Sequence, residues 1–167
     1  MREFPLFSRI SKFLRKKFCK TVCISGYFQV LTQGHVDYVR DAQKLGGYLV
    51  VIVNSDEQAK LKSTPMVVSE TARMYIMENL KGVDEVVLSI DKDKSVSKTI
   101  EYLAPDIFCN GGDRVLGNHS SSEELICNKL GIEMVFINSP KVDSSSGILQ
   151  RAHQILSENE QNGYNKA

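Results

Sequence analysis

The stretch that decides the fold covers residues 21–45, TVCISGYFQVLTQGHVDYVRDAQKL. Its first five residues form a short β-prone run, and residues 34–45 have the pattern of a helix that Gly46 and Gly47 end. A strand that passes through a glycine-containing loop into a helix is typical of the first half of a βαβ unit. This stretch therefore predicts an α/β protein.

The same alternation of strand and helix continues along the chain. Residues 48–54, YLVVIVN, form a continuous apolar run, as expected of a strand that is buried on both faces. Five strands are predicted, at 21–25, 48–54, 85–88, 106–110 and 133–137, with helices at 34–45, after Ser69, and at 95–103, 120–130 and 144–157. This order predicts a five-stranded parallel sheet with helices on both faces, a Rossmann-like fold. Such a sheet binds its ligand beyond the carboxyl ends of the strands, where strand order reverses.

The composition indicates one globular domain without nucleic-acid or metal-binding signals. Of 167 residues, 42% are hydrophobic and the net charge is +1, which gives no reason to expect a nucleic-acid partner. The four cysteines form no CxxC pair, and no histidine lies near them in the sequence, so no metal site is predicted. No apolar run is long enough to span a membrane. We therefore expect a cytoplasmic protein with reduced thiols.

The two ends of the chain differ in composition from residues 21–157, the predicted α/β domain. Residues 1–20 carry seven basic side chains and one acidic side chain, a balance of +6, with phenylalanines at helical spacing. We interpret them as a basic amphipathic helix that packs on the domain or across a homodimer. Peripheral contact with an anionic membrane is the less favoured alternative. Residues 158–167 are predicted to be a polar, frayed tail.

The loop after the first strand has the residues of an anion site. Gly26 allows a close approach of backbone, and Gly34 opens the helix with little steric bulk. Free N–H groups at a helix start attract phosphate, and His35 adds a side-chain donor there. A lone histidine is more often structural, but this position favours a function.

Two further loops offer groups for phosphate. Gly111 and Gly112 precede Asp113 and Arg114, whose guanidinium could hold a phosphate; the alternative is a glycine turn with a solvated ion pair. Ser144, Ser145 and Ser146 open the last predicted helix, either as phosphate donors or as an ordinary cap. Lys60, Lys62 and Arg73 are further candidates, although lysines on a loop are usually only solvated.

These motifs resemble those of the cytidylyltransferase-like superfamily, which includes glycerol-3-phosphate cytidylyltransferases and heptose-phosphate adenylyltransferases. Residues 26–35, GYFQVLTQGH, are similar to the signature G-x-F-D-x-x-H-x-G-H, and the resemblance covers about residues 21–150. It implies a nucleotidyltransferase that uses an NTP with Mg²⁺, CTP slightly ahead of ATP, and a phosphorylated polyol or sugar. It also implies catalytic roles for His35, Thr32 and Lys62 and substrate contacts for Lys60 and Arg73. The nucleotide-binding set that it implies is Gly26, Tyr27, Phe28, Gly34, Gly111, Asp113, Arg114, Ser144, Ser145 and Ser146.

Two positions depart from the signature. Thr32 stands where the family has its first histidine, and Gln29 stands where it has aspartate. Loss of one positioned donor to the reacting phosphate typically costs about 10²–10³ in rate. A catalytically weakened or inactive nucleotide-binding protein on the same fold is therefore the alternative function.

Overall fold

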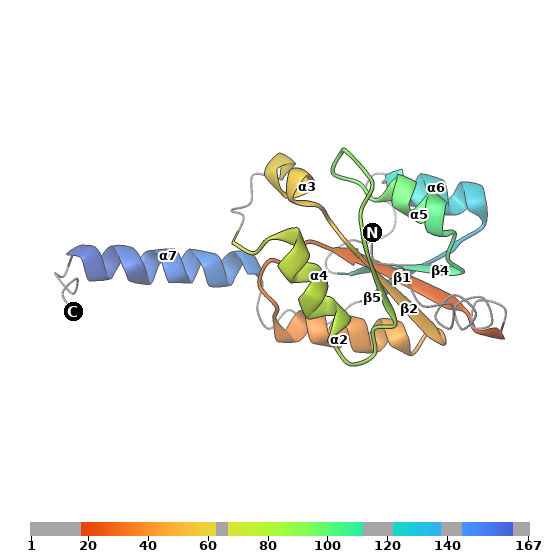
Figure 1. Ribbon diagram of the computed structural model, residues 1–167, viewed down its shortest axis with the longest axis horizontal. Helices are drawn as coiled ribbons and strands as arrows, with labels where there is room; N and C mark the ends of the chain where they lie inside the picture. Colours follow the sequence, from red (N-terminus) through yellow and green to blue (C-terminus); the bar gives the residue numbers. More distant parts are fainter. Residues whose placement is uncertain (1–17, 63–66, 112–121, 138–144, 162–167) are drawn as a thin grey trace.

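Five parallel strands form one sheet at the centre of the molecule (Figure 1). The computed structural model describes residues 18–62, 67–111, 122–137 and 145–161. The strands are β1 (Thr21–Gly26), β2 (Tyr48–Val53), β3 (Glu85–Leu88), β4 (Ile107–Gly111) and β5 (Glu133–Ile137). Their order in the sheet is β3-β2-β1-β4-β5, and each neighbouring pair is parallel. The predicted five-stranded parallel sheet is confirmed.

Strand β1 lies in the middle of the sheet, between β2 and β4. In β2, the run Leu49–Val53 is buried throughout, so both of its faces lie against other residues. Val22 of β1 aligns with Leu49 on one side and with Ile107 of β4 on the other. The apolar run read from the sequence therefore corresponds to a strand buried on both faces.

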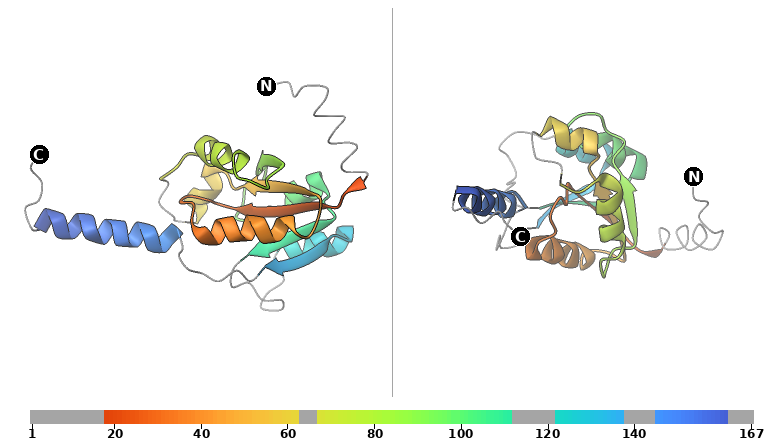
Figure 2. Two further views of the ribbon diagram at one scale, coloured as in Figure 1. Left: turned by 90° about the horizontal axis from the view of Figure 1, so that it is seen from below. Right: turned by 60° about the vertical axis from the view of Figure 1, so that its left-hand side comes forward.

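Helices cover both faces of this sheet. On one face, α2 (Gln33–Gln43) and α4 (Glu70–Glu78) contribute Val39, Ala42 and Met77 to a core with alternate residues of β1 and β2. On the other face, α5 (Ser97–Leu103) and α6 (Ser122–Leu130) contribute Ile100 and Cys127 to a second core. Figure 2 shows the sheet between these two helical layers.

Two helices differ from the prediction. The short helix α3 (Asp56–Leu61) was not predicted; it begins because the hydroxyl of Ser55 accepts a hydrogen bond from the backbone N–H of Gln58. The last helix, α7 (Ser145–Gln161), continues past the predicted end at residue 157 into the segment expected to be frayed. It projects away from the sheet in all three views (Figures 1 and 2).

The predicted N-terminal helix at 1–20 lies almost wholly outside the described residues, which begin at Phe18. In the part of the chain that is described, no helix combines the length and apolar character needed to cross a membrane.

Candidate functional site

The sheet reverses its strand order between β1 and β4, and the site motifs follow the carboxyl ends of these strands. β1 ends at Gly26 and β4 ends at Gly111. Both positions exclude a side chain because aromatic rings lie against them. A Cβ atom on Gly26 would lie 2.8 Å from the ring of Phe28, and one on Gly111 would lie 2.9 Å from the ring of Tyr38. Aromatic side chains therefore occupy the space beside the last residue of each of these two strands.

Phe28 holds a constrained conformation beside the candidate catalytic histidine. Its φ is +48°, in the left-handed region that bulky residues rarely adopt, and its side chain is buried. Its ring meets the His35 imidazole edge to face, with centroids 5.5 Å apart. Backbone strain of this kind typically costs about 1–3 kcal/mol and gathers at functional sites.

Thr32 and His35 form a capping pair at the start of α2. Thr32 is the N-cap residue, and its backbone N–H donates to Nδ1 of His35 over 3.1 Å. The Thr32 hydroxyl also lies 2.9 Å from the same nitrogen. Because a backbone N–H can only donate, Nδ1 must be the unprotonated nitrogen, and neutral His35 carries its proton on Nε2.

Burial favours this neutral form. It lowers the pKa of His35 below the ordinary value of 6.5, because the imidazolium would lose hydration there. His35 therefore offers one N–H donor, at Nε2, near the free N–H groups of the α2 N-terminus. This arrangement can hold an anion and donate a hydrogen bond to an oxygen that gains charge.

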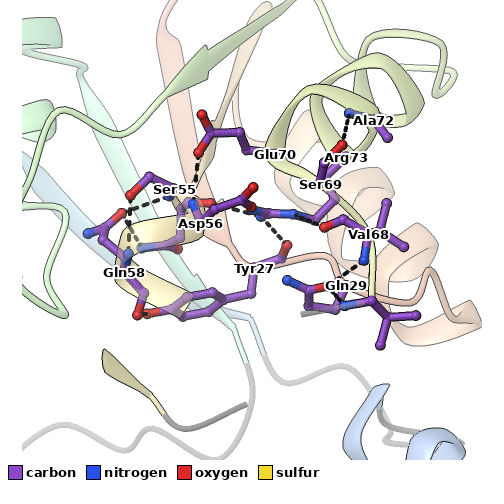
Figure 3. A network of polar contacts seen from close by, with 12 residues as sticks. Tyr27, Gln29, Ser55, Asp56, Gln58, Val68, Ser69, Glu70, Ala72 and Arg73 are labelled. Carbon is purple, nitrogen blue, oxygen red and sulfur yellow. Dashed lines mark hydrogen bonds and ion pairs between the residues drawn. The ribbon is translucent and has the colours of Figure 1, made fainter. Parts of the chain in front are cut away.

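Arg73 lies inside the protein and fastens the ends of two strands (Figure 3). Its side chain is 0% exposed, and its guanidinium donates to the carbonyls of Tyr27 (2.6 Å), Asn54 (2.8 Å) and Val68 (3.1 Å). It also forms a 2.6 Å ion pair with Asp56. The expected direct contact between Arg73 and substrate does not match this geometry, because four of its five N–H donors hold backbone and Asp56. The Arg73 side chain therefore has a structural role.

Gln29, which replaces the signature aspartate, is also part of this framework. Its side-chain oxygen accepts hydrogen bonds from the backbone N–H groups of Val67 (3.2 Å) and Val68 (3.1 Å) (Figure 3). Gln29 therefore ties the loop after β1 to the segment that leads into α4. A carboxylate could accept the same two bonds.

Sequence reasoning missed Gln58, the buried residue that joins β2 to the loop after β3. Its amide nitrogen donates to the carbonyls of Asp93 (2.7 Å) and Ser95 (2.6 Å). Its oxygen accepts from Asn54 and from the backbone N–H of Ser55. The sequence signal was the Ser55-x-x-Gln58 spacing, which is that of a capping box.

Tyr27 and Lys62, both predicted site residues, contact each other. The Lys62 ammonium lies 4.8 Å from the centroid of the Tyr27 ring, a cation–π contact, and the Tyr27 hydroxyl donates to the carbonyl of Gln58. This contact places Lys62, at the end of α3, beside the loop that follows β1. Lys60 lies exposed on α3.

Ser145 connects α7 to the same loop. Its hydroxyl donates to the carbonyl of Val30 over 2.8 Å, and Ser146 follows it at the start of the helix. Gly34 lies in the first turn of α2, next to His35. Three predicted nucleotide-binding residues, Asp113, Arg114 and Ser144, lie outside the described residues.

No metal centre is assigned. Within the described ranges, no group of three or more His, Cys, Asp or Glu side chains gathers in a way that could hold an ion.

Comparisons with known proteins find relatives over most of this chain. A family model described as cytidylyltransferase-like matches residues 23–152. The chain is 35% identical to a protein named FAD synthase from Ferroglobus placidus, over 79% of this chain and 87% of that protein. It is also 35% identical to the bifunctional protein HldE from Blochmanniella floridana, over 78% of this chain but only 27% of that longer protein. The crystal structure of a lipopolysaccharide core biosynthesis protein from Thermoplasma volcanium superposes with a TM-score of 0.62 at 30% identity, covering 75% of this chain and 99% of that one.

Proposed function

Because this chain belongs to the cytidylyltransferase-like family of nucleotidyltransferases, we propose that it joins the nucleotidyl group of an NTP to a small phosphorylated substrate. A phosphate oxygen of the acceptor attacks the α-phosphorus and forms a new P–O–P bond. The bond between the α-phosphorus and the bridging oxygen breaks, and pyrophosphate leaves. This reaction depends on in-line positioning and on charge stabilisation rather than on a protein nucleophile.

The observation that carries the proposal is the pairing of Thr32 with His35. It leaves Nε2 of His35 as a fixed N–H donor at the start of α2, beyond the carboxyl end of β1. We assign this N–H to the α-phosphate, where negative charge develops during attack. A fixed donor is effective there because it needs no reorganisation as the charge forms.

The remaining predicted residues are proposed to hold the phosphates and the acceptor. Lys62 and Arg114 provide positive charge, and the serines at 144–146 provide hydroxyl and N–H donors for the β- and γ-phosphates. Mg²⁺ is proposed to accompany the triphosphate, as it commonly does when phosphates supply most of its ligands. No residue of this chain is assigned to it.

The relatives bear on the choice of base and acceptor. The sequence favours CTP slightly over ATP, whereas the relatives named FAD synthase support ATP, because the nucleotide half of FAD carries adenine. The other half of FAD is a flavin whose phosphate sits on a ribityl chain, which is chemically a phosphorylated polyol. Relatives named HldE match at similar identity, so a sugar phosphate fits the resemblance as well. We propose ATP as the donor and a phosphorylated polyol chain or sugar as the acceptor.

The direct test measures pyrophosphate release by the full chain with MgATP or MgCTP. FMN, a heptose phosphate and glycerol 3-phosphate serve as acceptors, one at a time, and a reaction without acceptor is the control. We expect release that needs one acceptor and one base, together with a product whose mass equals acceptor plus nucleoside monophosphate minus water. Absence of release with every pair, from folded protein, would contradict the proposal.

A nucleotide-binding protein without transferase activity is the second candidate. It is favoured by one observation, that the Thr32 hydroxyl faces His35 instead of adding a second imidazole donor. Calorimetry separates the two functions. Tight binding of ATP or CTP without pyrophosphate release would support this candidate.

A third proposal concerns recruitment to membranes through residues 1–20. Co-sedimentation of the full chain with anionic liposomes tests it, because binding through basic residues should weaken as salt increases.

A further inference from the structure

Helix α7 presents an apolar stripe along the part that projects from the domain. Ile148, Ala152 and Ile155 follow one another at steps of four and three, and Leu149 and Leu156 lie beside them. These positions form one face of an α-helix, in the spacing that helical pairs use for their contact. Gln150 lies on the opposite face.

This stripe is exposed in the part of α7 that lies farther from the domain. Ile155 is 57% exposed and Leu156 is 63% exposed, while Ile148 and Leu149, nearer the domain, are half-buried. Figures 1 and 2 show α7 extending beyond the sheet and the helices that cover it. A helix of this length is stable in water mainly when its apolar face packs against something.

The charged residues beside the stripe indicate that its partner is a second copy of the same helix. Arg151 and Glu158 are exposed and lie seven residues apart, both on the same flank of the stripe. If a second copy of α7 packs antiparallel, with Ala152 opposite the second copy's Ile155, the flank that carries Arg151 and Glu158 lies against the same flank of the second copy. Arg151 of each copy then lies opposite Glu158 of the other, which gives two ion pairs, and Leu149 lies opposite Leu156. Parallel packing would instead place Arg151 beside Leu156.

We propose that α7 is an antiparallel homodimerisation helix. The antiparallel arrangement also places the two domains at opposite ends of the helix pair, with the starts of the two helices about 25 Å apart for 17 residues at 1.5 Å each. The proposal assigns an interface to the homodimer that the sequence predicts. The proposal does not depend on nucleotidyl transfer, although the bond from Ser145 to Val30 places the start of the dimer helix against the signature loop.

The test is sedimentation velocity of the full chain over a wide range of concentration. A two-helix contact buries less than a standard interface, so we expect a reversible dimer with Kd on the order of 10 μM. Arg151→Glu puts like charges opposite each other and should raise Kd by about tenfold or more. The double variant Arg151→Glu with Glu158→Arg should restore Kd to near the original value, because both pairs are re-formed with reversed sign.

Gln150→Glu is the matched control, because it adds an acid on the outer face and should leave Kd unchanged. Leu156→Gln, which keeps helix propensity, should weaken the dimer through the stripe itself. Circular dichroism of each variant checks that the helix remains. A monomer at all concentrations, or a dimer that Arg151→Glu does not weaken, would overturn the proposal; the latter result would point to another surface, such as residues 1–17. Failure of the double variant to recover would rule out the antiparallel arrangement.

Discussion

Thr32 and His35 are joined through a single nitrogen: Nδ1 of His35 lies 3.1 Å from the backbone N of Thr32 and 2.9 Å from its hydroxyl oxygen. The backbone contact needs no particular side chain at position 32, so it fixes the His35 tautomer whatever residue stands there. The hydroxyl contact, in contrast, requires a hydroxyl side chain at position 32. Thr32 thus acts on His35, in addition to any contact that it makes with phosphate.

Loss of the His35 imidazole should mainly affect the chemical step. We expect His35→Ala to lower kcat/KM by roughly 10²-fold or more, about 2.7 kcal/mol, with the fold retained. Steady-state pyrophosphate release measures the effect. His153→Ala, which removes an exposed histidine from α7, is the control and should keep full activity. Equal activity of both variants would exclude His35 from the mechanism.

His35 should also make stability depend on pH. Burial lowers its pKa below 6.5 in the folded protein, so the unfolded chain takes up a proton at this position more readily. Its contribution to stability is present above about pH 6.5 and is lost as pH falls through the folded-state pKa. Between about pH 7.5 and 5.5, the free energy of unfolding should therefore fall less steeply in His35→Gln than in the original protein. Urea titrations of both proteins at each pH measure the difference.

Removal of the buried guanidinium should destabilise the whole domain. Arg73→Met leaves the carbonyls of Tyr27, Asn54 and Val68 without this donor, and we expect a loss of about 3–5 kcal/mol. Arg40→Met is the matched control, since Arg40 is exposed and its ion pairs with Asp37 and Asp41 lie on the surface of α2, so the change should cost about 0–1 kcal/mol. Chemical denaturation measures both. Similar losses in the two variants would show that the Arg73 network contributes little.

Ser145 should link α7 to nucleotide binding. Ser145→Ala removes the bond to the Val30 carbonyl together with a proposed phosphate donor, so NTP affinity should fall by about 1–3 kcal/mol. Ser157→Ala removes a comparable hydroxyl bond farther along α7 and should leave affinity unchanged. Calorimetric titration with MgATP compares them, and wild-type affinity in Ser145→Ala would remove this residue from the site.

The strands were predictable because their burial produces a simple sequence pattern. The run YLVVIVN at 48–54 is apolar because β2 contacts residues on both faces, and β5 coincides with the predicted strand at 133–137. The end of α7 was not predictable in this way. Residues 158–161 are polar, and a polar segment can continue a helix without any periodic apolar residue to mark it.

The candidate site was predictable in its location but not in its internal contacts. Strands β1 and β4 do lie side by side at the reversal of strand order, as the alternating pattern implied. The role of Arg73 was not visible, because a buried arginine that donates to distant carbonyls leaves no spacing in the sequence. Its partners at Tyr27 and Asn54 are 46 and 19 residues away.

The last prediction concerns Thr32 itself. Thr32→His, alone or with Gln29→Asp, installs the imidazole that the family signature has at this position. Thr32 is 8% exposed, so the larger ring needs space that threonine does not occupy, and the change at the N-cap position should cost about 1 kcal/mol of stability. The backbone N–H to His35 is kept. Turnover should therefore rise, mainly in kcat, because the new donor strengthens with charge that develops in the transition state.

Thr32→Asn is the control for this change, because asparagine caps a helix as well as threonine does but brings no imidazole. A rise in kcat for Thr32→His that Thr32→Asn does not share would assign the gain to the second imidazole. If the original protein already turns over fast and Thr32→His abolishes activity while the fold persists, the site has been rebuilt around threonine. In that case the hydroxyl contact to His35 is itself the catalytic adaptation, because it orients the one remaining imidazole. The variant Thr32→Val should then lose activity as well.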